Sequence, residues 1–503
     1  RCRRLGELAR EDVALRTRTG TLGLLELRGG GGPADAQSME QGSVEVQLWR
    51  GDANVAALPV AGGGAAAPDR ASVPVCVRRY RGAEAIQLAR AEERAHRRVE
   101  LRRAQAAFTS AYAPEGDPTT PPVADASTAA LKARVRALRA QLIDLARASG
   151  TGGGEGASGE VAALVGAFDA GSDAAGAAAS SERWVVLRED GCVCTASDYV
   201  RLAAEVGTRA PLGFDGGLLD KIDPRRALRR RAAYVREAMR LAADALCELH
   251  AAELAHGALG PTSVALGPAG ATAPVDERAA TPWGVPLRVR LRDLALSVDV
   301  SDAALLGGAT LGEVQRGASG ADLYRSEELA SAGVAPAGDG PAGDAARDMW
   351  GRASAAGARS AAERRAFALS EDVAALGVTF MMLALGPLAR PNEVDVPTLE
   401  RTLRAVVGTG EGAAPSAADE ALDEARGVED VAQALRDYVL ADPKFAEAGA
   451  VLDGAAGASA DDGGWGLIAA MSQSDWRRRP AARSLCAHPY LAREASAGWV
   501  LLR

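Results

Sequence analysis

The chain has 503 residues and a net charge of −8, from 58 Lys and Arg against 66 Asp and Glu. This balance, without a basic stripe interleaved with aromatics, argues against a nucleic-acid partner. Hydrophobic residues make up 48% of the chain, enough for a sizeable core, and the six scattered cysteines favour a reducing compartment over a disulfide scaffold.

The longest apolar run, Val373 to Leu388, is shorter than the roughly 20 residues that span a bilayer. We therefore expect a core helix there and no transmembrane segment. Only three lysines occur, so nearly all positive charge is arginine. A codon bias towards arginine is a simple explanation wherever an arginine stands at a notable position.

In chain order, two β-rich segments, Thr21 to Leu27 and Ser43 to Arg50, flank the glycine run Gly29 to Gly32. The run lacks the spacing G-x-G-x-x-G, so a flexible loop is the favoured interpretation and a phosphate cradle the alternative. A strand is predicted at Val73 to Tyr80, followed by a charged helix from Ala83 to Ala107.

Apolar segments and low-complexity stretches then alternate. An amphipathic helix is predicted from Ala129 to Ala148, and Gly/Ala/Ser-rich segments at 150–159 and 171–181 bracket an apolar strand, Val161 to Phe168. Another apolar strand, Trp184 to Gly191, follows them.

A helix and a loop stand at the centre of the chain. Apolar residues recur at helical spacing up to His250, which predicts a core helix that ends there. The loop after it leads into a short apolar strand, Val264 to Leu266. The loop residues of interest are His256, Gly257, Ala258, Leu259, Gly260, Pro261 and Ser263.

Further motifs follow in the last two hundred residues. A strand, Leu287 to Leu291, leads into Asp293 and the two residues after it, Leu and Ala. YRSEEL contains Glu328, the helical pattern SEDVAALGVTFMMLALG contains Asp372, and LIAAMSQSDWRRRPAARSLCAHPYL contains Arg479.

In order and type, these motifs resemble those of the protein kinase family. HGALGPTS is similar to the catalytic loop H-R-D-L-K-P-x-N, DLA to D-F-G, YRSEEL to Y-x-A-P-E-L, and SEDVAALG to the large-lobe helix S-x-D-x-W-x-x-G. The resemblance covers about residues 19–491. It implies an α+β, bilobal fold with a small β-rich N-lobe and a large helical C-lobe, interrupted by low-complexity insertions.

The resemblance also implies a domain organisation. We expect an extension at 1–18, an N-lobe at 19–190 with insertions at about 108–159 and 171–181, a C-lobe at 191–491 with insertions at about 267–286, 333–368 and 391–464, and a tail at 492–503.

The matched positions carry implied roles at a nucleotide site. Arg78 stands where the family has its ATP-anchoring lysine. Its helix partner is sought among Glu92, Glu93 and Glu100, for which a solvated charged face is the alternative. Backbone groups from Leu187 to Glu189 would face an adenine ring, and Asp293 would hold a metal ion, with a plain turn-forming role as the alternative.

Other matched positions imply structural roles. Glu328 is expected to pair with Arg479, Asp372 to cap backbone amides of the loop, and His256 to bond loop backbone rather than act as a general base.

The loop lacks the groups that perform the family's chemistry. Gly257, Ala258, Gly260 and Ser263 stand at the positions of its Arg, catalytic Asp, Lys and Asn. We therefore predict a pseudokinase that serves as a protein-interaction or regulatory scaffold and requires no cofactor, with weak binding of ATP and Mg²⁺ left open. The alternative is an atypical active Ser/Thr kinase, or another ATP-dependent transferase, that uses Asp293 and Arg78.

Location and partners are predicted only broadly. We expect an intracellular protein with protein partners of unknown identity. The stretch Cys194 to Val200 is similar to the hinge of thylakoid state-transition kinases, which favours a plastid. The cytoplasm and an apicomplexan secretory organelle are the alternatives.

Overall fold

The structure is a computed structural model that describes residues 14–15, 45–56, 70–112, 161–169, 182–188, 194–200, 224–268, 287–301, 341–388, 428–453 and 462–492. The predicted glycine-run loop, the helix at 129–148, Glu189 and Glu328 lie outside the described residues.

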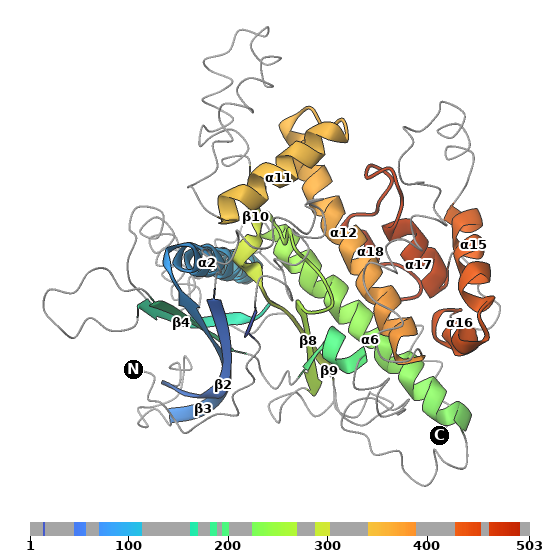
Figure 1. The fold of residues 1–503 in the computed structure, drawn as a ribbon, viewed down its shortest axis with the longest axis horizontal. Helices are drawn as coiled ribbons and strands as arrows, with labels where there is room; N and C mark the ends of the chain where they lie inside the picture. The colour runs from blue at the N-terminus through green and yellow to red at the C-terminus, as the bar shows by residue number, and fades with distance from the viewer. Residues whose placement is uncertain are drawn as a thin grey trace, which may run out of the picture.

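The N-terminal part contains an antiparallel sheet of five strands in the order β1-β2-β3-β5-β4, of which β2, β3 and β4 are labelled in Figure 1. The strands are β1 (Ala14–Leu15), β2 (Glu45–Ala56), β3 (Arg70–Arg81), β4 (Ala163–Asp169) and β5 (Glu182–Arg188). Side chains of a strand point alternately to opposite faces. In β3 this period places Cys76, Arg78 and Tyr80 on one buried face.

Helix α2 (Ala83–Tyr112) follows β3 directly and packs on the sheet. The turn between them is made at Gly82, whose φ is 89°. Side chains of α2, β3, β4 and β5 form an apolar cluster that also includes two residues from the helical part of the molecule. Its buried members are Tyr80, Ala85, Leu88, Ala89, Leu164, Val185, Leu187, Ala258 and Leu296.

Two long helices form the centre of the C-terminal part. They are α6 (Pro224–Ala251) and α12 (Ala361–Leu385), which lie side by side (Figure 1). Four apolar residues of α12, Val373, Leu376, Phe380 and Leu383, are at most 1% exposed, which confirms the predicted core helix. Further helices in the described residues of this part are α11 (Pro341–Ala355), α15 (Val428–Leu440), α16 (Ala446–Leu452), α17 (Gly464–Met471) and α18 (Ala482–Cys486).

Short strands pair beside the loop that follows α6. β6 (Cys194–Thr195), β8 (Val264–Pro268) and β9 (Leu287–Leu291) form one antiparallel sheet. β7 (Leu254–Ala255) pairs with β10 (Val298–Asp299) in another. Between β9 and β10 lies a 3-10 turn, η3 (Leu294–Leu296). These pairings join residues 254–268 to residues 287–301.

The stretch expected as an insertion at 333–368 is not loose from residue 341 onwards. It contains α11 and the first residues of α12, and Met349, Trp350, Ala353 and Phe367 are buried in one apolar cluster. Ser360 caps α12 through a reciprocal capping box with Glu363. The apolar residues are few among the alanines and glycines of this segment, so the sequence pattern does not predict these helices. This part of the predicted insertion is therefore corrected to packed helix.

One helical stretch in the described part of the chain, Ala361–Leu388, is long and apolar enough to cross a membrane. However, 78% of its most apolar window is buried inside the protein. Its apolarity is therefore accounted for by core packing, in line with the expectation of no transmembrane segment.

Two arginines attach α2 to the helical part. Arg98 donates to the carbonyl of Ala252 at 2.8 Å and to the carboxylate of Glu253 at 3.0 Å. Arg103 donates from Nη2 to Glu248 and to the carbonyl of Val161, each at 2.9 Å. These contacts fix the position of α2 relative to α6.

Candidate functional site

A buried ionic cluster lies where β3, α2 and the start of η3 meet. The Arg78 guanidinium pairs through Nη1 with Glu92 and through Nη2 with Asp293, the latter at 2.5 Å. Tyr80 donates its hydroxyl hydrogen to Glu92. Arg78 is 3% exposed, Glu92 0% and Asp293 8%. We call these four residues the Arg78 cluster.

The charges of this cluster stabilise one another. Burial opposes the charge on Arg78, but Asp293 and Glu92 together raise its pKa well above the usual value. Burial likewise opposes the charge on Glu92, yet Arg78, with His96 and Tyr80, lowers the Glu92 pKa to about 2. Glu92 and Arg78 are thus held as an ion pair across the neutral pH range.

The remaining predicted helix acids, Glu93 and Glu100, are also buried, at 0% and 3% exposure. Glu93 pairs with Arg183 of β5 at 2.6 Å, and Arg97 lies 3.9 Å from Glu93 and 3.7 Å from Glu100. The alternative of a solvated charged face is therefore wrong for all three glutamates. All three glutamates form ion pairs with buried arginines of α2 or of the sheet.

Asp293 is positioned by the turn after β9. Its φ of 68° is in the left-handed region, where a non-glycine residue is uncommon. The next residue, Leu294, is fully buried. This bend directs the Asp293 carboxylate back to Arg78, while Nε of Arg292 lies 3.9 Å from its second oxygen.

The loop after β7 is anchored to α12 by Asp372. The carboxylate accepts from the backbone N–H of His256 at 2.6 Å and of Gly257 at 3.0 Å, and His250 Nε2 lies 3.0 Å from it. This is the capping contact expected from the sequence. His256 in turn contacts the Arg292 carbonyl at 2.9 Å through Nε2, which ties the loop to the residue before Asp293.

Gly257 allows the loop to approach η3 closely. Its φ is 73°, and a Cβ atom at this position would lie 2.7 Å from the carbonyl oxygen of Leu296. An L-residue is strained at such a φ, and here it would also collide with backbone. Position 257 therefore requires glycine in the observed geometry.

The two other loop positions of interest carry no catalytic group. Ala258 is 5% exposed and belongs to the apolar cluster under the sheet. Ser263 is fully buried, and its hydroxyl donates to the Ala258 carbonyl at 3.3 Å. The Ala258 methyl group and the Ser263 hydroxyl are thus both engaged in packing or bonding within the loop.

The predicted hinge residue Leu187 lies inside the sheet instead. It pairs with Cys76 on one side and Leu164 on the other, and its side chain is 1% exposed. Arg188 continues the same pairing, so any hinge begins beyond it. The assignment of Leu187 to adenine binding is corrected to a core strand position.

Arg479 has a partner that the sequence motifs did not indicate. Its Nη1 donates to Glu371 at 2.9 Å, and its Nε donates to the Gln473 carbonyl at 2.8 Å. Glu371 precedes Asp372, so this contact supports the residue that anchors the loop. The expected partner, Glu328, lies outside the described residues.

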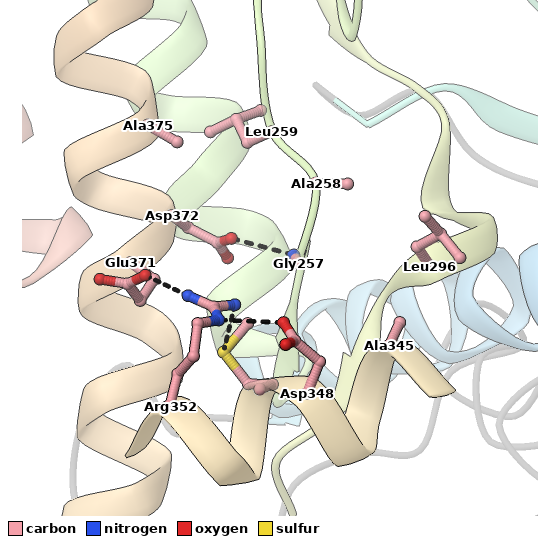
Figure 2. Close-up of a pocket in the computed structure, with 11 residues that line it drawn as sticks. Gly257, Ala258, Leu259, Leu296, Ala345, Asp348, Arg352, Glu371, Asp372 and Ala375 are labelled. Atoms are coloured by element: carbon pink, nitrogen blue, oxygen red, sulfur yellow. Dashed lines mark hydrogen bonds and ion pairs between the residues drawn. The ribbon is translucent and has the colours of Figure 1, made fainter. Parts of the chain in front are cut away.

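A pocket opens beside the loop, between α11 and α12 (Figure 2). Arg352 of α11 spans it, with Nε 3.0 Å from Asp348, a further ion pair to Glu371, and Nη2 3.5 Å from the Met349 sulfur. Arg352 thus pairs with two of the acids that line the pocket. The other lining residues are Gly257, Ala258, Leu259, Leu296, Ala345, Asp372 and Ala375.

The residues at Asp293 were tested for their fit to a metal ion. Within the described ranges, no group of three or more His, Cys, Asp or Glu side chains is arranged to hold one. Asp293 is the only carboxylate of the predicted metal site, and Arg78 binds it directly. The arrangement does not fit a divalent cation.

Sequence reasoning missed three contributors to this region. They are Tyr80 at the end of the predicted strand, Glu371 next to Asp372, and Arg352 within the range predicted as an insertion. The period-2 pattern of β3 could have placed Tyr80 beside Arg78. No sequence signal identifies the contacts of Arg352, because they depend on the packing of α11.

Comparison with known proteins gives no further assignment: no family model matches the chain, and no significant match is found among curated proteins.

Proposed function

We propose that the chain has a two-lobed, protein kinase-like fold that has lost phosphoryl transfer and acts as a protein-interaction or regulatory scaffold. The single observation that carries this proposal is the Arg78 cluster. The residues at the positions of the anchoring lysine, the helix glutamate and the metal-binding aspartate satisfy one another in a buried site.

The arrangement of elements supports the fold part of the proposal. An antiparallel five-stranded sheet precedes a helical part, and one long helix, α2, follows β3 and pairs with it through Arg78 and Glu92. The loop, the Asp293 turn and the anchoring Asp372 then occur in the family's order. The ion pair of Arg78 with Glu92 and the contacts of Asp372 with the loop are those that the proposed counterparts would make.

The loop supports the loss of chemistry. Phosphoryl transfer depends on positioning and on charge stabilisation, with an aspartate that orients the acceptor hydroxyl. The loop residues 256–263 contain no carboxylate, and Ala258 is buried among apolar side chains. No step of phosphoryl transfer is assigned to any residue of this site.

Incubation of the full chain with γ-phosphate-labelled ATP, Mg²⁺ or Mn²⁺ and a basic acceptor protein tests the proposal. We expect no label above that given by Asp293→Asn. Labelling that this substitution abolishes would favour the alternative, an atypical transferase that uses Asp293 and Arg78.

A thermal-shift arm separates binding from catalysis. A rise in Tm with ATP, without any labelling, would indicate an inactive protein whose scaffold role is controlled by nucleotide. If ATP leaves Tm unchanged, the site has a structural role only. Both results are compatible with the loss of phosphoryl transfer, and they distinguish two kinds of scaffold.

A further inference from the structure

We propose that Arg78 takes the place of the metal ion at this site, so that a guanidinium group bridges Glu92 and Asp293 and excludes divalent cations. The inference concerns the site of the proposed function and explains why the residues present do not fit a metal. It assigns to Arg78 a role different from that of a phosphate anchor.

Both carboxylate oxygens of Asp293 lie near arginine side chains. One carboxylate oxygen lies 2.5 Å from Arg78 Nη2, and the other lies 3.9 Å from Arg292 Nε. The Asp293 side chain is 11% exposed and that of Arg78 only 3%. A guanidinium therefore faces each oxygen that a metal ion would use.

The coordination requirements of Mg²⁺ also argue against binding at Asp293. Mg²⁺ takes six oxygen ligands in near-octahedral geometry and is usually held in proteins by one or two carboxylates together with phosphates and waters. An ion bound to Asp293 would lie next to the buried guanidinium of Arg78, where charge repulsion is screened poorly. Ser263 cannot compensate, because its hydroxyl is directed to the Ala258 carbonyl.

The shape of the arginine side chain allows one residue to bind two carboxylates. Its planar fork presents separate nitrogens to two acceptors, whereas lysine offers a compact point charge. Here Nη1 pairs with Glu92 and Nη2 with Asp293, so one residue serves both carboxylates. The two acids thus bind an internal cation in place of an external one.

Removal of that internal cation should open the site. In Arg78→Met, two buried carboxylates lose their shared partner, and an added divalent ion can replace it. The matched control is Arg79→Met, the next residue of β3. Arg79 lies on the other face, with its guanidinium 5.5 Å from the centre of the Trp184 ring.

Mn²⁺ binding, measured by electron paramagnetic resonance on the full chain without nucleotide, tests the inference. The wild type and Arg79→Met should bind no Mn²⁺ at millimolar concentration. Arg78→Met should bind one ion at least tenfold more tightly than the wild type and gain a few degrees in Tm when Mn²⁺ is added. The double variant Arg78→Met, Asp293→Asn should lose this gain.

Wild-type binding of Mn²⁺ that Asp293→Asn removes would overturn the inference. So would a folded Arg78→Met variant that binds no more Mn²⁺ than the wild type. If Arg78→Met does not fold, the wild-type titration and the Arg78→Lys variant test the inference. Lysine can pair with only one of the two carboxylates, so Arg78→Lys should bind Mn²⁺ with intermediate affinity. Wild-type Mn²⁺ binding without ATP labelling would refute this inference alone, whereas labelling dependent on Asp293 would refute the proposed function.

Discussion

The carboxylate of Asp372 accepts a hydrogen bond from the backbone N–H of His256, 116 residues earlier in the chain, at a distance of 2.6 Å. Asp372 is 2% exposed and also accepts from Gly257. The loop, whose residues 256–263 include no carboxylate, is therefore held on the core helix α12 by a buried carboxylate.

Asp372→Asn should destabilise the protein. The amide would place an N–H group opposite the backbone N–H groups of His256 and Gly257, which now donate to the carboxylate. We expect a loss of about 3 kcal/mol in the free energy of unfolding, from urea titration. The control is Asp348→Asn on α11, whose side chain is 44% exposed. Equal effects of the two substitutions would contradict the anchoring role of Asp372.

Gly257→Ala should be costly because the new Cβ would lie 2.7 Å from the Leu296 carbonyl at a φ of 73°. We expect a loss of about 2–4 kcal/mol in unfolding free energy. Gly351 offers a control of opposite sign, since no atom lies within 4 Å of its Cβ position and it sits within α11. Gly351→Ala should stabilise the protein by about 0.5–1 kcal/mol, and a loss there as large as at Gly257 would refute the steric argument.

Arg103→Ala should loosen α2 by removing its contacts with Glu248 and with the Val161 carbonyl. The expected cost is about 2 kcal/mol, a roughly 30-fold rise in local opening. Hydrogen exchange of the α2 amides measures this directly. The neighbouring exposed Arg102 is the control, and Arg102→Ala should leave the exchange unchanged. If both variants exchange like the wild type, Arg103 does not fix the helix.

The ion pair between Glu92 and Arg78 makes the stability of the folded protein depend on pH in a defined direction. The Glu92 pKa falls from 4.5 to about 2 in the folded protein, so its contribution is complete above pH 4.5 and is lost as pH falls towards 2. The stability difference between the wild type and Glu92→Gln should therefore shrink by about 3 kcal/mol from pH 7 to pH 2. Urea titrations at several pH values test this, and parallel curves for the two proteins would be the contrary result.

Much of the element order was predictable because apolar periodicity is strong in the relevant segments. The strand before α2, the helix ending near His250 and the core face of α12 all follow from spacings of two or of three to four residues. The contact between Asp372 and the loop was predicted from the resemblance of SEDVAALG to a kinase helix, and a carboxylate is a suitable acceptor for backbone amides.

Partner choice was not predictable where it depends on how elements pack. Sequence spacing could not choose among Glu92, Glu93 and Glu100, since the rotation of α2 against β3 decides which acid meets Arg78. The link from Arg78 to Asp293 joins residues 215 positions apart, through the turn geometry of Asp293. Helix α11 was missed because alanine and glycine dominate the segment around its few apolar residues.

Calorimetric titration of the full chain with ATP, once in Mg²⁺ and once in EDTA, tests the central claim that Arg78 replaces the cation of a phosphotransferase site. We expect the same result in both buffers, whether weak binding or none. Sub-millimolar ATP binding that requires Mg²⁺ and disappears in Asp293→Asn would contradict it.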